Sequence, residues 1–272
     1  MLPLIPRFFG LLATGLLLAA TAQAQAPTRP APGPGAAPSD EQSYRKEFVY
    51  GINFNTQGGL LGGGSVRSSR VLDDRFLRFW SIEGVMLKNT KEERVNTVVG
   101  GSFVERKTNY AFVLRPSVGL QRILFRKAAD AGVQVNGLVS VGPSLGLLMP
   151  YHISYDRTVA AAGGGPPNLQ GDEIVNEQYD PVKHAVTSAI LDRGPLFSGI
   201  GQTSVVPGFH VRGGLSFEYG RYRDAVTGLE AGFLVEAFTK RLLILSPEAD
   251  RDDLNRQFFP SVYLTLYFGH RS

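Results

Sequence analysis

Hydrophobic and polar residues alternate along successive segments of this chain, and this two-residue period constrains the fold more than any other feature. The last such segment, 262–268, reads Val-Tyr-Leu-Thr-Leu-Tyr-Phe, with its apolar residues at even positions. Because successive side chains of a β-strand point to opposite faces, each segment predicts a strand with one apolar and one polar face. Repetition of such segments, each roughly ten residues long, is typical of β-barrels that span outer membranes.

The N-terminal residues 1–24 have the three parts of a secretory signal peptide. Arg7 supplies a positive charge, 11–20 is an apolar run, and 22–24 is a small-x-small cleavage site. The run is too short to span a bilayer as a helix, which disfavours an N-terminal membrane anchor. Residues 25–45 are rich in proline, alanine and glycine and predict a periplasmic tether, more plausibly a spacer than a docking segment. Residues 46–272 then form the barrel domain, and we expect export to the outer membrane of a Gram-negative bacterium.

The sequence contains no cysteine, which excludes disulfides, thiolate metal sites and a lipid-modified cysteine at the cleavage point. An exported protein without disulfides is held by sheet hydrogen bonds and packing alone. The formal net charge of +4 comes from scattered lysines and arginines that form no run. This pattern argues against nucleic-acid binding and predicts at most modest attraction to anionic lipid headgroups.

The strand count decides the architecture. After residue 24 no stretch approaches 18 uninterrupted apolar residues, so any membrane span must be β. The segment 60–69 is weakened by Gly62, Gly63 and Gly64, but we include it because bacterial barrels have an even number of strands with both termini periplasmic. The prediction is an all-β fold, an eight-stranded antiparallel transmembrane β-barrel. Its predicted strands are 46–56, 60–69, 75–88, 108–124, 132–149, 204–220, 225–238 and 258–269.

The connections fall into two kinds. Short charged connections are typical of periplasmic turns, and long ones are typical of external loops. The predicted periplasmic turns are 70–74, 127–131 and 221–224, and the predicted external connections are the tight hairpin 57–59 and the long loops 89–107, 150–203 and 239–257.

Several charged residues avoid the aromatic faces of their predicted strands, namely Arg115, Arg212, Glu218, Glu230 and Glu236. In the strand 204–220, for example, Phe209 and Val211 share one face, while His210 and Arg212 share the other. A soluble β-sandwich shows the same alternation with the apolar face inward, so the period alone leaves that alternative open. A charge that faces lipid at mid-depth costs roughly 2 to 4 kcal/mol, and aromatic residues gather near the strand ends, as in interfacial girdles. Both patterns favour the barrel.

Two features fit this pattern less well. Pro116, Pro143 and Pro207 lie within predicted strands, where a proline removes a hydrogen-bond donor, so we expect bulges or strand ends there. The segment 76–86 is apolar on both faces in places, which leaves its register undecided.

Short motifs spread from about Tyr44 to the C-terminus carry a resemblance. They are 50–59, 82–83, 88–92, 109–110, 114–122, 142–147, Asp180 with His184, 197–201, 207–208 and 217–218. With these motifs the chain resembles an uncharacterised outer-membrane β-barrel family of Bacteroidota. The resemblance implies the barrel fold and the outer-membrane location, and it implies no particular activity. Asn89 and Thr90 depart from the family's Lys-His-Pro-Lys-Glu pattern in the segment 88–92.

The polar faces would line the inside of the barrel. An eight-stranded barrel has an interior about wide enough for side chains alone. We predict that its arginines and glutamates form a salt-bridged plug, because a buried charge must be paired. The alternative is a narrow gated pore or ion path, in which His210 would act as a pH-sensitive latch. The predicted polar network of the lumen consists of Glu83, Arg115, His210, Arg212, Glu218, Glu230 and Glu236.

One motif suggests an enzyme. His152-Ile153-Ser154 follows a strand end and resembles the His-x-Ser pairing of eight-stranded outer-membrane lipid A deacylases, in which the histidine would deprotonate the serine nucleophile. The sequence shows no oxyanion hole and no clear orienting acid, although Asp156 and Glu173 lie near. We therefore predict that the protein is not an enzyme and keep a lipid-modifying hydrolase as an alternative.

The loop 150–203 also carries oxygen and nitrogen donors that suit a hard cation such as calcium. Their spacing matches no EF-hand or zinc pattern, so we predict a solvated acidic loop, with no metal and no cofactor. These donors are Asp172, Glu173, Glu177, Asp180 and His184.

The sequence thus predicts location better than activity. We expect a structural, anchoring or surface-recognition role that depends on the external loops, chiefly 150–203. The expected partners are outer-membrane lipids and an unidentified envelope or surface protein, and nucleic acid is not expected.

Overall fold

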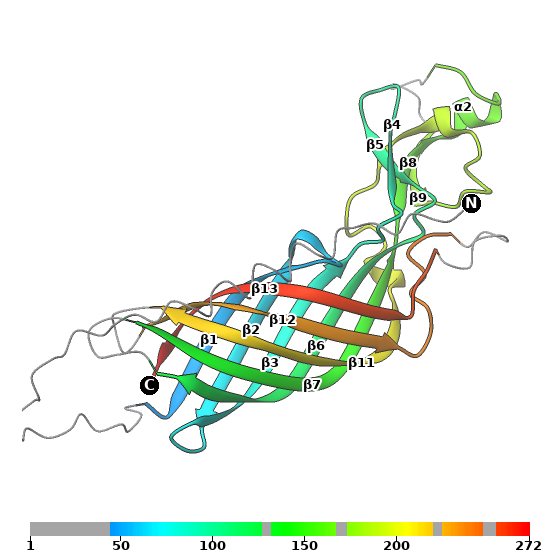
Figure 1. Cartoon of the computed structure of the whole chain (residues 1–272). Coiled ribbons are helices and arrows are strands. Elements are labelled where there is room, and N and C mark those ends of the chain that lie inside the picture. Colours follow the sequence, from blue (N-terminus) through cyan, green and yellow to red (C-terminus); the bar gives the residue numbers. More distant parts are fainter. Residues whose placement is uncertain (1–43, 127–131, 167–172, 220–224, 247–253) are drawn as a thin grey trace, which may run out of the picture. The chain divides into compact units, whose positions relative to one another are not determined.

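Eight antiparallel strands close into a barrel (Figure 1). The computed structural model describes residues 44–126, 132–166, 173–219, 225–246 and 254–272. The predicted signal peptide and all but the last residues of the predicted tether lie outside this described part, so both stay predictions. The order of strands around the barrel is β1 (Lys46–Asn55), β13 (Phe258–Arg271), β12 (Ala225–Phe238), β11 (Ser204–Tyr219), β7 (Val133–Pro150), β6 (Asn109–Phe125), β3 (Phe76–Leu87) and β2 (Gly59–Val71).

Each predicted strand is confirmed, including the glycine-rich one. Strand β2 pairs with β1 on one side and with β3 on the other. Its glycines allow this close approach: a Cβ atom on Gly63 would lie 1.9 Å from the carbonyl oxygen of Gly84 in β3. A residue type that weakens strand propensity is thus required here by the distance between two backbones.

The short and long connections lie at opposite ends of the barrel. The connections β2–β3, β6–β7 and β11–β12 share the end where Arg45 N donates to Ser272 O, which brings together the beginning of β1 and the end of β13. The connections β1–β2, β3–β6, β7–β11 and β12–β13 share the other end. This arrangement matches the predicted sorting, and we refer to the second end as the outer end.

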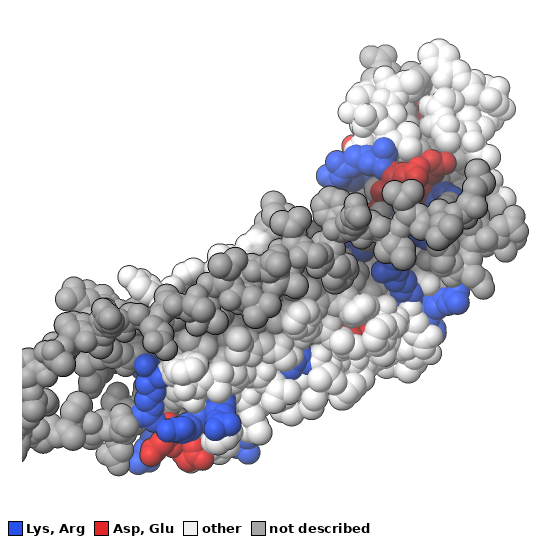
Figure 2. Space-filling view, viewed as in Figure 1, with Lys and Arg blue, Asp and Glu red and all other residues white. Residues whose placement is uncertain are grey.

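The apolar faces of the strands point outward. Phe233 is 71% exposed and Val118 is 61% exposed, whereas Glu230 and Glu236 between outward residues of β12 are 2% and 0% exposed. A two-layer sandwich would bury the aromatic faces, so that alternative is wrong. Figure 2 shows the same distribution on one face, where charged side chains gather toward the two ends and the middle is largely uncharged.

The expectation of bulges or strand ends at the prolines is wrong. Pro116, Pro143 and Pro207 all lie within continuous strands. The ladder between β6 and β7 has no pairs at 115–117 and resumes beyond them in the same register, which places Pro116 opposite Pro143. Because neither proline has an N–H group, the ladder loses hydrogen bonds there without a shift. Pro207 pairs with Leu145 near the outer end of β11.

Strand β3, whose register the sequence left undecided, buries its odd-numbered residues. Leu77 and Phe79 near one end and Val85 and Leu87 near the other are all less than 5% exposed, with Glu83 between them. Trp80 and Ile82 point outward. Along β3 the inward face is therefore ionic in its middle and apolar toward both ends of the strand.

The two longest outer connections contain secondary structure that the sequence did not predict. The hairpin of β4 (Glu93–Asn96) and β5 (Ser102–Glu105) lies within 88–108. A three-stranded sheet of β8 (His152–Asp156), β9 (Ile174–Gln178) and β10 (Ile190–Arg193), with the short helix α2 (Arg157–Ala161), lies within 151–203 (Figure 1). We call 88–108 and the described part of 151–203 the external cap.

The external cap packs around a hydrophobic cluster that also includes Tyr110 and Met149 from the outer ends of β6 and β7. Tyr110 and Tyr151 stand edge to face with centroids 5.2 Å apart, and Tyr151 Oη accepts a hydrogen bond from Val104 N at 3.0 Å. Phe103 and Ile153 complete the centre of this cluster, and each is at most 2% exposed. Within the described residues, no helix is long and apolar enough to cross a membrane.

The outward face generates a first prediction. Phe233 lies near the middle of β12, so Phe233→Arg places a charge against acyl chains and should lower the free energy of unfolding by about 2 to 4 kcal/mol. The measurement is urea unfolding of protein refolded into phospholipid vesicles. Val182→Arg is the control, because Val182 is 87% exposed in the external cap and its substitution should change stability by less than about 0.5 kcal/mol. Equal effects of the two substitutions would contradict the membrane-facing assignment.

Candidate functional site

The middle of the barrel interior is held by a clasp between β6 and β12. Arg115 Nε and Nη2 each donate to a different carboxylate oxygen of Glu236, both at 2.8 Å. Arg115 Nη1 lies 3.2 Å from Glu83 Oε1, and these two residues are direct cross-strand partners in β6 and β3. The paired, two-point geometry is the strongest form of an arginine–carboxylate contact.

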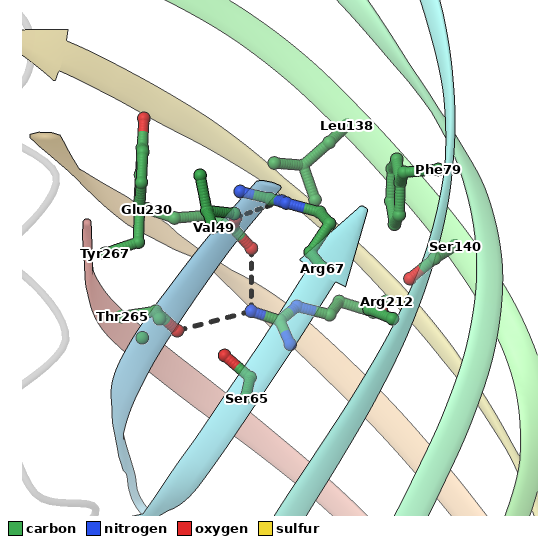
Figure 3. A pocket seen from close by; sticks show the side chains of 12 residues that line it. Val49, Ser65, Arg67, Phe79, Leu138, Ser140, Arg212, Glu230, Thr265 and Tyr267 are labelled. Carbon is green, nitrogen blue, oxygen red and sulfur yellow. Dashed lines mark hydrogen bonds and ion pairs between the residues drawn. The ribbon is translucent and has the colours of Figure 1, made fainter. Parts of the chain in front are cut away.

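A second arginine, Arg212, connects these ion pairs to Glu230. Arg212 in β11 donates to Glu83 at 2.5 Å and to Glu230 at 2.7 Å. Glu230 also accepts from Arg67 in β2 at 2.7 Å and from Tyr263 Oη at 2.9 Å. Figure 3 shows Arg67 and Arg212 converging on Glu230 from different strands.

These side chains form a charge-balanced unit that we call the central network. It contains three arginines (67, 115 and 212) and three glutamates (83, 230 and 236) joined by ion pairs. Each carboxylate accepts hydrogen bonds from at least one guanidinium, which offsets part of the free energy required to remove the charges from water. The side chains of the central network therefore fill the middle of the barrel interior.

His210 joins the central network through Ser144. Ser144 Oγ donates to Glu236 Oε1 at 2.5 Å and lies 3.0 Å from His210 Nδ1. His210 is 2% exposed, so the imidazole lies inside the barrel beside the arginine–glutamate clasp.

Glu218, which was predicted as part of the same network, belongs to a separate ion group near the end opposite the outer end. It accepts from Arg271 Nη1 at 2.7 Å, and Arg271 Nη2 lies 2.7 Å from Glu47 Oε2. The guanidinium of Arg271 also lies 4.2 Å from the centre of the Tyr44 ring. This group ties the beginning of β1 to β11 and to the last residues of β13.

An apolar cluster closes the outer end of the interior. Leu242 and Ile244 come from the β12–β13 connection and pack against inward residues of the strands, including Leu87 and Phe259. The side chain of Asn255 holds this segment in place, since it accepts from Ile244 N at 2.9 Å and donates to Leu245 O at 2.8 Å. The cavity beside Arg67, Arg212 and Glu230 has about 20 Å³ of space for water, which suits one or two molecules.

Several interior residues were missed from the sequence. Arg67 shares its strand face with serines in a segment diluted by glycine, and Arg271 is the second-last residue of the chain. The alternation could have identified Arg67 and Glu47 as inward-facing, because both follow the parity of the polar face. Ser144 and Tyr263 also follow this parity, but the sequence does not show which carboxylate each one contacts, because that depends on the side chains that lie across the lumen.

The predicted cation donors of the loop are engaged with one another and with the backbone. Glu177 lies between Lys183 at 2.5 Å, Arg157 at 3.1 Å and His184 at 3.1 Å. Burial raises the pKa of Glu177, but hydrogen bonds from these three side chains outweigh that effect and lower the pKa to about 2. Asp180 accepts from Val182 N at 2.8 Å.

Two further donors complete this set. Glu173 Oε2 accepts from Thr158 Oγ1 at 3.4 Å, and Asp172 lies outside the described residues. In the described ranges, no three His, Cys, Asp or Glu side chains are grouped so as to hold a metal ion.

His152 and Ser154 lie two residues apart on β8 and therefore on the same face of that strand. Among the described residues no hydrogen bond joins them, and His152 Nδ1 lies 3.2 Å from Pro150 O. Asp156 instead caps α2, with its carboxylate accepting from Thr158 N and Val159 N at 2.9 and 3.1 Å. The suggested acid is thus engaged in helix capping.

Comparison with known proteins adds little beyond the architecture. No family model matches the chain, and no curated protein matches it. Among solved structures, Ail of Yersinia pestis is 9% identical in its complex with the heparin analogue sucrose octasulfate, with 84% of this chain and 99% of Ail covered and a TM-score of 0.35. Neisserial surface protein A is 11% identical, with 84% of this chain and 97% of that chain covered and a TM-score of 0.36.

The structure itself decides the class of protein. A closed eight-stranded antiparallel barrel with an apolar outside and an ionic inside is built like the barrels of bacterial outer membranes. The protein is an outer-membrane type β-barrel. The resemblance to one family of Bacteroidota stays a prediction, because sequence identities of 9% and 11% with TM-scores of 0.35 and 0.36 assign neither a family nor a taxon.

The central network generates a second prediction. Glu230→Gln removes the charge that pairs Arg67 and Arg212, and loss of one partner of a buried ion pair costs about 3 to 5 kcal/mol. Urea unfolding in vesicles, followed by the fluorescence of the single tryptophan Trp80, should show this loss. The control Glu93→Gln alters an exposed carboxylate of β4 and should leave the midpoint within error. An unchanged midpoint for Glu230→Gln would show that the network does not hold the barrel.

Proposed function

We propose that this protein is an outer-membrane surface protein whose closed barrel anchors an external cap that performs recognition. The observation that carries the proposal is the contrast between the two regions. The lumen is filled by the central network and the apolar cluster, whereas the outer connections build a sheet and hairpin that pack around a second hydrophobic cluster. Ordered structure at the outer end is where an anchored barrel would meet a ligand or partner.

The filled lumen supports anchoring over conduction. An ion path would require the Arg115–Glu236 clasp to separate and the segment that contains Leu242 to leave the outer end. Separation would remove the guanidinium that pairs with Glu236, a carboxylate that is 0% exposed, which is energetically costly. The narrow gated pore therefore remains the second candidate, with the continuous set of charged residues in its favour.

The lipid-modifying hydrolase has less support. His152 and Ser154 share a strand face, but the carboxylate of the nearby Asp156 is engaged in capping α2. The apolar outer surface supports lipid contact for the barrel in the plain sense of a membrane anchor.

The proposed orientation gives a third prediction, for which the absence of native cysteine is convenient. In intact cells a membrane-impermeant maleimide should label Val182→Cys in the external cap and should not label Leu72→Cys in the β2–β3 turn. Both positions are well exposed, at 87% and 56%, so any difference reports the side of the membrane. After cell lysis both variants should react. Labelling of Leu72→Cys in intact cells, or none of Val182→Cys, would refute the orientation.

The filled lumen gives a fourth prediction. Purified protein in planar bilayers should show no stable unitary currents, because side chains fill the middle of the lumen and the cavity beside Arg67 and Glu230 has only about 20 Å³ of space for water. Insertion is checked by a gel of heated and unheated samples, and a porin serves as the positive control. Reproducible openings that change with Arg115→Ala would favour the gated pore over the closed anchor.

A further inference from the structure

A cavity of about 440 Å³ lies between the β4–β5 hairpin and the outer ends of β3 and β6. Its volume is in the range of small-molecule sites and far exceeds that of the interior cavity. Residues distant in sequence contribute to it, from Lys88 just after β3 to Arg193 at the end of β10. It is thus a product of the folded cap.

The lining of this cavity is strongly basic. Its charged residues are four cations, Lys88, Arg94, Lys107 and Arg193, and one carboxylate, Glu92, which gives a formal charge of +3. Glu92 is already occupied, since Lys107 Nζ lies 2.8 Å from its Oε2. Within the described part of the chain, Lys88, Arg94 and Arg193 have no ion-pair partner. Three cations around one cavity repel each other unless an anion lies among them.

Lys107 shows that the site is partly dry. It is 4% exposed, and its ammonium lies 4.9 Å from the centre of the Tyr110 ring. Burial lowers the pKa of Lys107, and Glu92 opposes this effect. Electrostatic attraction to an anion is stronger beside such a buried wall than on an open surface.

The remaining walls are aromatic and aliphatic. Tyr110, Tyr151, Phe103, Met86 and Leu196 line the cavity beside the cations. Among the described residues the Tyr110 hydroxyl has no hydrogen-bond partner, so it is available as a donor. A ligand that matches this lining has an anionic group and a larger body with both polar and apolar surface, and the volume exceeds what an inorganic anion needs.

We propose that this cavity binds the phosphate group of a phosphorylated sugar. Lys88, Arg94 and Arg193 contact the phosphate, and the sugar ring fills the space toward Tyr110 and Leu196. The inference deepens the proposed function, on which it rests, by naming the ligand class of the external cap. Two sources share this chemistry: the headgroup of a phosphorylated glycolipid in the outer leaflet and a free sugar phosphate.

The test uses the full chain refolded in detergent and titration calorimetry with glucosamine 1-phosphate. Wild type should bind this probe and should not bind glucosamine. The double variant Arg94→Ala/Arg193→Ala should bind at least about tenfold more weakly, because two charge-assisted contacts are lost. The control Lys240→Ala removes an exposed cation that does not line the cavity and should bind like wild type.

A second arm distinguishes the sources. Lipid A in mixed micelles should displace glucosamine 1-phosphate at lower concentration than the free sugar phosphate if the ligand is a lipid headgroup, and dephosphorylated lipid A should not. If neither glucosamine 1-phosphate nor lipid A binds wild type, or if the double variant binds as tightly as wild type, the proposal is overturned.

Labelling of Val182→Cys in the Arg94→Ala/Arg193→Ala background distinguishes a failure of the ligand proposal from a failure of the proposed function. If the external cap is labelled in intact cells and the protein shifts on heating, the variant is folded and the anchored-cap function stands even when sugar phosphate binding fails.

Discussion

The requirement that buried charges be paired governs the interior of this protein. Arg115 pairs with Glu236 across the lumen, and Glu83 pairs with both Arg115 and Arg212. Glu230 accepts hydrogen bonds from Arg67, Arg212 and Tyr263. These side chains come from six strands, β2, β3, β6, β11, β12 and β13, so the ion pairs form only when those strands are in register. A slip of one residue in any strand would turn a charge toward lipid and an apolar side chain toward the network. The pairing therefore selects one register as well as filling the barrel.

The closure of the lumen and the external cap are parts of one structure. The segment that carries Leu242 and Ile244 into the outer end also supports the cap, because Thr108 N donates to Ile244 O and Lys107 forms a β-bridge with Leu245. Tyr151 N in turn donates to Thr108 O. Residues that border the basic cavity are thus hydrogen-bonded to the β12–β13 segment that closes the outer end. A rigid floor of this kind holds binding side chains at fixed spacing, which lowers the entropy lost when a ligand binds.

The barrel could be predicted closely, and the external cap could not. Strands such as β11 and β12 alternate over most of their length, so their approximate bounds and most of their inward residues follow from the side-chain period. The strands β4, β5, β8, β9 and β10 have four or five residues each, too few for a period to stand out from a loop. Pro116 and Pro143 were misjudged because a sequence does not show that two residues without N–H groups lie opposite each other. The sequence likewise did not show that Glu218 pairs with Arg271, since position along the barrel axis depends on strand tilt and register.

The sequence by itself determined, for the strands that alternate clearly, which residues share the apolar face and which share the polar face, and it favoured a barrel with an ionic interior. That information is local, because it resides in the alternation along single strands. Only the tertiary structure decided which charges pair, that the outer end is closed by the β12–β13 connection, and that Lys88, Arg94 and Arg193 surround one cavity. These features join residues separated by tens to more than a hundred positions, and such contacts are fixed by register and packing, which leave no periodic mark in the sequence.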